Sequence, residues 1–182
     1  MNQFASVELT QQSQRDVTNS LIRFGKEAEK VIRDVVNRTA LAIETDAKMK
    51  LKSDGHIITS RLRSSVHAET ISGQKYTYSD SDGKSYDGAL GEKLENLEAV
   101  AGTNVEYAGA IEFGTGPHLI LPKNKKALKF EIDGKPVFAK SVKHPGFKGD
   151  SFLGYAAEKQ RPKFVQRMTD ALNKLIQSEQ RV

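Results

Sequence analysis

The chain contains no cysteine. It therefore has neither disulfide bridges nor thiolate ligands for zinc, and its composition fits a protein made in a reducing cytoplasm. No run of apolar residues approaches the length that a bilayer requires, and the N-terminus lacks a basic segment followed by an apolar one. We therefore expect a soluble protein with no membrane partner. Its 182 residues are enough for a single domain, 1–182, with a hydrophobic core of its own.

The sequence also lacks the motifs of common catalytic and cofactor sites. The four histidines, at 56, 67, 118 and 144, do not have the spacing of metal ligands. The run Gly114-Thr115-Gly116 has neither the lysine nor the further glycines of a phosphate-binding loop, and Pro117 follows it. No serine lies in a Gly-x-Ser-x-Gly elbow. We expect no catalytic residues, no cofactor and no metal, and hence a protein that is not an enzyme.

The positive charge is unevenly distributed along the chain. The net charge is +5, and residues 117–150 alone contribute +5 through eight lysines, whereas residues 79–95 contribute −3. A run of charge is usually a solvated face, but a fold with one basic and one acidic edge can pair with copies of itself or with a polyanion.

Two segments show the apolar periodicity of amphipathic helices. In residues 16–52 apolar side chains recur at steps of three and four, which predicts one long helix. Its length indicates that it either bridges a wide sheet or lies in a contact between subunits. A short helix is predicted at 60–65, capped by Thr59 or Ser60. A closing helix is predicted to begin near Pro162, because proline is tolerated in the first turn of a helix and not in its middle.

Strands are predicted between these helices. Residues 66–78 and 97–105 are each expected to form one strand, and 107–113 to form a helical turn that Gly114 ends. Residues 128–132 alternate as a half-buried strand does, and Asp133-Gly134 turns the chain into 137–142. A two-residue loop would place Val137 and Ala139 on the face of Phe130, and a three-residue loop would place Phe138 there. Because both faces carry apolar residues, we expect the chain's own helix to cover one face and a neighbouring subunit to cover the other.

These elements predict an α+β fold. We expect an antiparallel sheet of about four strands with a long N-terminal helix and a C-terminal helix packed on it. We also expect a flexible N-terminus, 1–14, and a mobile acidic loop, 79–95.

The segment from Tyr107 to Phe152 carries the most distinctive motifs. They are Tyr-Ala followed by Glu-Phe-Gly-Thr (107–108 and 112–115), Lys-Ala-Leu-Lys-Phe (126–130), Val-Phe-Ala-Lys followed by Val and His-Pro-Gly (137–146), and the aromatic Phe152 before the last helix. In this order they resemble the neck or tail-completion proteins of long-tailed double-stranded-DNA bacteriophages. The acidic insert before the second strand departs from that family's pattern.

The resemblance implies a function as well as a fold. It implies a structural virion protein, assembled in the host cytoplasm, that forms a homomeric ring, most plausibly a hexamer, in the head–tail connection. DNA would pass through the ring, and other neck and tail proteins would be its partners. The residues implied for structural corners and the subunit interface are Glu112, Phe113, Gly114, Phe138, His144, Pro145, Gly146 and Phe152. Those that could face DNA are Lys123, Lys125, Lys126, Lys140 and Lys143.

The alternative hypothesis is a basic nucleic-acid-binding module without catalytic activity. Phe130, Phe138 and Phe147 lie among the lysines of the basic segment, and such interleaving can hold a phosphate backbone while bases stack on the rings. The alternation around Phe130 favours a core role for that ring instead. An enzyme with an unrecognised site is the least favoured hypothesis.

Overall fold

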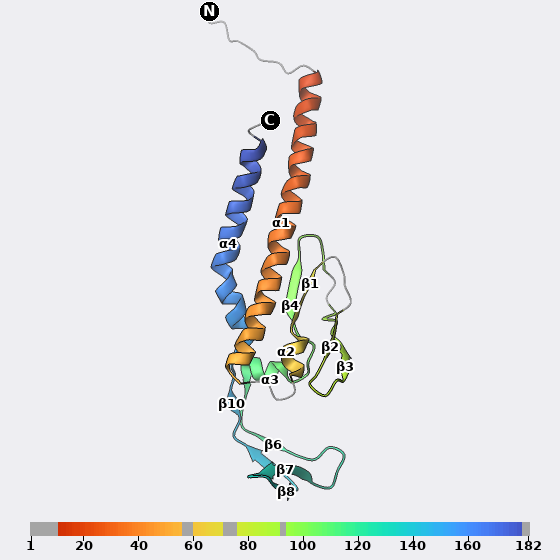
Figure 1. Ribbon diagram of the computed structural model, residues 1–182, viewed down its shortest axis with the longest axis vertical. Helices are drawn as coiled ribbons and strands as arrows, with labels where there is room; N and C mark the ends of the chain where they lie inside the picture. Colours follow the sequence, from red (N-terminus) through yellow and green to blue (C-terminus); the bar gives the residue numbers. More distant parts are fainter. Residues whose placement is uncertain (1–10, 56–59, 71–75, 92–93, 180–182) are drawn as a thin grey trace, which may run out of the picture.

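Two long helices lie side by side along the molecule, and smaller elements gather at one end of the pair (Figure 1). The structure, a computed structural model, describes residues 11–55, 60–70, 76–91 and 94–179. The helices are α1 (Gln11–Ser53), α2 (Arg61–Ser65), α3 (Ala108–Phe113) and α4 (Phe152–Glu179). Together with the short strands these confirm a mixed α+β fold with a long N-terminal and a C-terminal helix.

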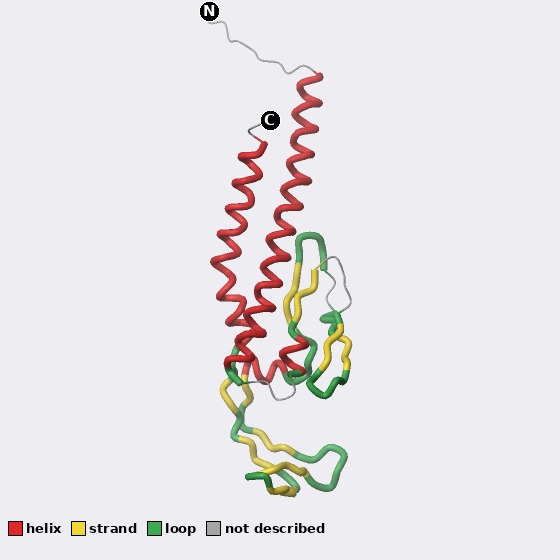
Figure 2. Tube along the Cα trace, viewed as in Figure 1, coloured by secondary structure: helices red, strands yellow, loops and turns green. Residues whose placement is uncertain are grey.

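Helix α1 confirms the predicted long amphipathic helix and begins at Gln11, so residues 11–14 are already helical. The rest of the predicted flexible N-terminus lies outside the described residues. Toward the C-terminal end of α1, Ala47 and Leu51 are fully buried, whereas Val17 and Leu21 near its start are exposed. The helix does not bridge a wide sheet, because α4 is its main neighbour along its length (Figure 2).

A buried polar contact joins the two long helices. The carboxylate of Asp46 on α1 accepts hydrogen bonds from Lys159 Nζ at 2.7 Å and from Gln160 Nε2 at 2.6 Å, both on α4. Burial alone would raise the pKa of Asp46, but these hydrogen bonds outweigh it and hold the pKa below its usual value. The contact fixes the register of the helices, since a buried carboxylate is costly without such partners.

The hydrophobic core lies where α4 begins and α1 ends. Phe152, Leu51 and Val66 are fully buried there, and Leu62 and Tyr78 pack beside them. The core thus joins segments from both halves of the chain. We use the name body for the four helices together with the strands at residues 67–70, 77–79, 85–87, 99–102, 114–115 and 147–148.

The strands form antiparallel pairs, so the predicted four-stranded sheet was wrong. The pairs in the body are β1 (His67–Thr70) with β4 (Ala99–Gly102), β2 (Thr77–Ser79) with β3 (Ser85–Asp87), and β5 (Gly114–Thr115) with β10 (Phe147–Lys148). The strand predicted at 66–78 is two strands, β1 and β2, in separate pairs. These strands are only two to four residues long, and each pairs with one partner without extending into a wider sheet.

Two further predictions about the body need correction. The segment 79–95 is not a loop throughout, because β3 lies within it. In the turn between β2 and β3, the carboxylate of Asp80 accepts hydrogen bonds from the amides of Asp82 and Lys84. Thr59 lies outside the described residues, and Ser60 occupies the N-cap of α2 without a capping side-chain hydrogen bond.

Helix α4 begins at Phe152, so the prediction that the closing helix begins near Pro162 was wrong. A proline inside a helix removes one backbone hydrogen bond and costs about 3 kcal/mol. The first turns of α4 bury Phe152 and Ala156 completely. Burial of a large apolar side chain contributes about 1.5–3 kcal/mol, which offsets that cost.

The remaining strands form an extension at one end of the molecule (Figure 1). They are β6 (His118–Ile120), which pairs with β9 (Val142–His144), and β7 (Leu128–Ile132), which pairs with β8 (Lys135–Ala139). We call residues 118–144 the arm. Phe130 lies opposite Val137 and Leu128 opposite Ala139, so the hairpin has the two-residue loop. The strand predicted at 137–142 breaks after Ala139, and β9 pairs with β6 instead.

Within the described ranges, no helix is long and apolar enough to cross a membrane.

Candidate interaction surface

The arm leaves and re-enters the body through a glycine-rich corner. Gly114 has φ 80°, in the left-handed region, and confirms that a glycine ends α3. A Cβ on Gly114 would overlap the backbone of Phe147 and Gly149. The two chain segments come this close because β5 pairs with β10 and Asp150 N donates to Ile111 O at 2.8 Å. The outgoing and returning segments are therefore fixed to each other.

Glu112 joins this corner to the start of α4. Its carboxylate accepts backbone N–H bonds from Phe152 at 2.8 Å and from Leu153 and Gly154 at 2.9 Å each. The hydroxyl of Ser151 donates to the same carboxylate at 2.5 Å. The first amides of a helix have no partner within the helix, so a carboxylate from α3 satisfies three of them in α4 and interacts favourably with the helix dipole.

The electrostatics of Glu112 follow from this geometry. Partial burial would raise the pKa of Glu112, but the hydrogen bonds from Ser151 and the three amides outweigh it, and the pKa lies below its usual value. Glu112 is thus held in its ionised form as a structural residue. The Glu-Phe-Gly-Thr motif indicated a corner but gave no signal of this capping role.

A second turn closes the base of the arm. Gly146 has φ 79°, and a Cβ there would overlap the backbone of Thr115 and Gly116. Its N–H donates to His144 Nδ1 at 3.0 Å, and His118 Nδ1 donates to Gly116 O at 2.9 Å. The two imidazoles are cross-strand neighbours with centroids 4.9 Å apart. His144, Pro145 and Gly146 therefore lie at the base of the arm, between β9 and β10.

No residue of the arm is buried, although the arm carries many large apolar side chains. The exposed fractions are 66% for Phe138, 58% for Leu121, 54% for Ile132 and 53% for Leu119. The arm strands pack chiefly on each other, and none of the four described helices covers either face of the hairpin. The expectation that the chain's own helix covers the hairpin was wrong.

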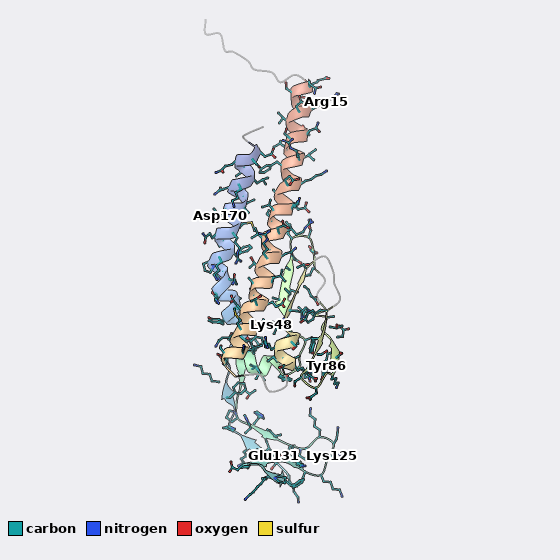
Figure 3. The ribbon with its side chains drawn as sticks, in the orientation of Figure 1. Arg15, Lys48, Tyr86, Lys125, Glu131 and Asp170 are labelled. Carbon is teal, nitrogen blue, oxygen red and sulfur yellow. The ribbon has the colours of Figure 1, made fainter. Side chains whose placement is uncertain are left out.

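The five predicted DNA-facing lysines all lie on the arm and are all exposed. Lys123, Lys125 and Lys126 lie between β6 and β7, Lys140 follows β8, and Lys143 is on β9. Figure 3 shows Lys125 and Glu131 in the arm, at the far end of the molecule from Arg15. The structure therefore brings the lysines and the exposed apolar residues together on one extension.

The remaining predicted interface residues differ in exposure. Phe113, at the corner, is 84% exposed and available for a contact. Phe152 is fully buried in the core, so its role is structural and it offers no contact surface. Sequence reasoning missed Leu119, Leu121 and Ile132 as surface residues, because apolar residues in a strand pattern indicate a covered face without indicating which chain covers it.

No group of three or more histidine and carboxylate side chains in the described part of the chain has the arrangement of a metal site. Comparison with known proteins found no matching family model, no matching curated protein and no matching solved structure.

Proposed function

We propose that this chain is a structural subunit of the head–tail connection of a long-tailed double-stranded-DNA bacteriophage, acting as a neck or tail-completion protein. It assembles into a homomeric ring, a hexamer by the resemblance, through which DNA passes. Other neck and tail proteins are its further partners, and its place is the virion. No catalysis is part of the proposal. The motif resemblance supports the class of protein, and the uncovered arm supports self-association.

The uncovered arm is the observation that carries self-association. Two-stranded antiparallel pairs are at best marginally stable alone in water and need an apolar face packed against something. The arm offers Phe138 and four exposed aliphatic side chains, Leu119, Ile120, Leu121 and Ile132, which are 36% to 66% exposed together with Phe138. Full burial of such a side chain from water contributes about 1.5–3 kcal/mol, so burial of the exposed part of each still contributes a share of that. A covering protein surface would therefore stabilise the arm and bind tightly in the same step.

The geometry of the arm favours a ring over a symmetric dimer. The arm lies at one end of the molecule, away from most of the body. In the proposed assembly it docks on a different surface of the next copy, which makes the contact heterologous. A heterologous contact that repeats with a closing rotation produces a ring. The rigid corner at Gly114 and Gly146 gives the arm one direction, which a closed ring of fixed size requires.

The alternative function is nucleic-acid binding by the arm as a monomeric or dimeric module. The exposed lysines of the arm favour it, because phosphate contacts from lysine dominate nonspecific DNA affinity. Such a module would bind DNA with an affinity that falls steeply with salt, and it would form no ring.

Sedimentation across a wide range of concentration, with electron microscopy at the highest, tests the proposal. We expect a single closed species of defined mass that appears as rings. Phe138→Ser should raise the concentration of half-assembly at least about tenfold, equivalent to about 1.4 kcal/mol, because it removes the most exposed large apolar side chain of the arm. Phe138→Leu, which keeps an apolar side chain, is the matched control and should change it far less. Monomers at every concentration, with no rings in the images, would overturn the proposal.

A further inference from the structure

The β7–β8 hairpin of the arm has two outer edges, and neither edge is paired with a further strand. Within the described residues, β7 and β8 pair only with each other, and no loop adds a backbone hydrogen bond to them. Half of the N–H and C=O groups of each strand point away from the hairpin, and such groups can pair with another chain. The edges of the arm are therefore candidate docking sites, distinct from its exposed apolar faces.

The turn determines which residues of β7 have outward-pointing backbone groups. Residues 133–134 form a two-residue loop with positive φ at both positions, so the flanking residues Ile132 and Lys135 make the hydrogen-bonded pair that closes the turn. Hydrogen-bonded and non-hydrogen-bonded pairs alternate along an antiparallel ladder. The backbone N–H and C=O groups of Lys129 and Glu131 therefore point to the outer edge of β7.

The outer edge of β8 differs from that of β7, because it contains a proline. Pro136 lies opposite Glu131 and has no N–H. The hairpin loses no hydrogen bond at this position, but the outer edge of β8 loses a donor. Proline on an edge strand is one of the devices that deter pairing with another chain. Because β7 contains no proline, its edge is the better docking site.

The sequence of β7 is complementary to a second copy of itself. Residues 128–132 read Leu-Lys-Phe-Glu-Ile, so that opposite charges flank Phe130. When two such strands run antiparallel with Phe130 opposite Phe130, Lys129 of each strand lies opposite Glu131 of the other. These are the residues whose backbone groups point to the edge, so the same pairs also form the hydrogen bonds of the ladder.

The two charges of the β7 edge have no partner within the hairpin. Lys129 lies opposite Phe138 and Glu131 lies opposite Pro136, and both charged side chains are exposed. Neither takes part in the ion pairs of the described residues. A lysine on an edge strand usually deters pairing. Here Glu131 stands two residues away, so antiparallel pairing of two copies brings opposite charges together.

We propose that two copies of the chain pair through the outer edges of β7, antiparallel about a two-fold axis at Phe130, so that their hairpins form one four-stranded sheet. A sheet of three or more strands with an apolar face is stable where a lone two-stranded pair is marginal. The inference goes beyond the proposed ring, whose contact uses the apolar faces of the arm. A two-fold contact joins copies in pairs and closes no ring by itself, so it also forms in the free protein.

A single cysteine at the two-fold axis tests the contact directly, because the chain has no cysteine of its own. The Cα atoms of a non-hydrogen-bonded pair are about 4.5 Å apart, which a disulfide can span. We expect Phe130→Cys to form a covalent dimer under mild oxidation at least about tenfold faster than Lys125→Cys. Lys125→Cys is the matched control, because Lys125 lies on the arm outside β7 and is more exposed than Phe130.

Exchange of the two charges tests the register and leaves Phe130 in place. Lys129→Glu or Glu131→Lys alone puts like charges opposite each other at two points of the contact. In sedimentation of the full chain at low ionic strength, each should raise the dissociation constant of the two-copy species at least about fivefold. The chain with both substitutions keeps its net charge and should return to within about threefold of the unmodified protein, because the charges match again. The control Lys125→Glu should stay within about threefold.

Other outcomes would overturn the inference. If the exchanged chain does not recover, the β7 edges do not meet in this register, whatever the cysteine variant does, and rings of the unmodified protein would still support the proposed function. If Lys129→Glu weakens association and Glu131→Lys strengthens it, β7 faces an acidic surface and not its own copy. If the unmodified protein stays monomeric at every concentration, the inference and the proposed function fail together.

Discussion

Replacement of Glu112 is expected to destabilise the protein strongly, although Glu112 lies on a helix of only six residues. Glu112→Ala leaves three amides at the start of α4 and the hydroxyl of Ser151 without their acceptor. Loss of one N-cap side chain costs about 0.5–2 kcal/mol, and each buried donor that stays unpaired costs about 1–3 kcal/mol. Water reaches part of this site, so we expect a loss of about 2–4 kcal/mol in the free energy of unfolding.

The pH dependence of this loss has a definite sign. The pKa of Glu112 is lower in the folded protein than its usual value. A depressed carboxyl pKa contributes stability above the unfolded pKa, and that contribution disappears as the pH falls through the folded pKa. The difference in unfolding free energy between the unmodified protein and Glu112→Gln should therefore be full at pH 7 and shrink toward pH 3.

Urea unfolding followed by circular dichroism measures both effects. Glu27→Gln, an exposed position on α1, is the matched control and should change the free energy of unfolding by no more than about 0.5 kcal/mol. A loss below about 0.5 kcal/mol for Glu112→Ala would refute the capping argument. A difference for Glu112→Gln that stays constant between pH 7 and pH 3 would refute its electrostatic part.

Three further substitutions test the corner and the contact between α1 and α4. Gly114→Val and Gly146→Val should each prevent normal folding or assembly, because a β-branched side chain would overlap backbone at a positive φ. Gly109→Val is the control, because a Cβ at Gly109 meets nothing within 4 Å. Normal yield and assembly of Gly114→Val would contradict the close backbone approach at the corner. Asp46→Ala should lower the free energy of unfolding by about 1–3 kcal/mol, because it leaves the buried Gln160 amide without its acceptor, whereas the Lys159 side chain is 39% exposed and can turn to water. A thermal melt unchanged from that of the unmodified protein would contradict this.

The sequence correctly predicted the elements that depend on the spacing of apolar residues within one segment. The apolar steps of α1 and the alternation of Leu128, Phe130 and Ile132 each depend on the period of one element, and the structure confirms both. The turn at Asp133-Gly134 could also be predicted, because Asp and Gly are favoured in two-residue hairpin turns whose residues have positive φ, as both do here.

Features that depend on distant segments could not be predicted in this way. Proline disfavours the interior of a helix, which is why the closing helix was expected to begin near Pro162. Burial of Phe152 and Ala156 in the core outweighs that cost and extends α4 toward its N-terminus. The capping role of Glu112 depends on residues about forty positions away that meet it only in the fold. The residue pattern of a single segment does not indicate which distant residues will contact it.

The exposed face of the arm shows a further limit of sequence patterns. The alternation in β7 and β8 predicted that the hairpin is covered, but the pattern is the same whether the cover is part of the same chain or another molecule. Among the described residues, no helix or strand outside the arm lies over the hairpin. The pattern on both faces led to the expectation of a helix on one side and a neighbouring subunit on the other. The helix was wrong, and cover by another copy stays a proposal that rests on the exposure of the arm.

Hydrogen exchange of the arm amides in dilute and in assembled protein tests most directly the central claim that another copy covers the arm. In dilute monomer, amides of β6–β9 should exchange much faster than those of α1 and α4, because no residue of the arm is buried. In the assembled species their protection should rise at least about tenfold, while the protection of the helix core near Phe152 changes little. Arm amides with equal protection in the two states would contradict the claim.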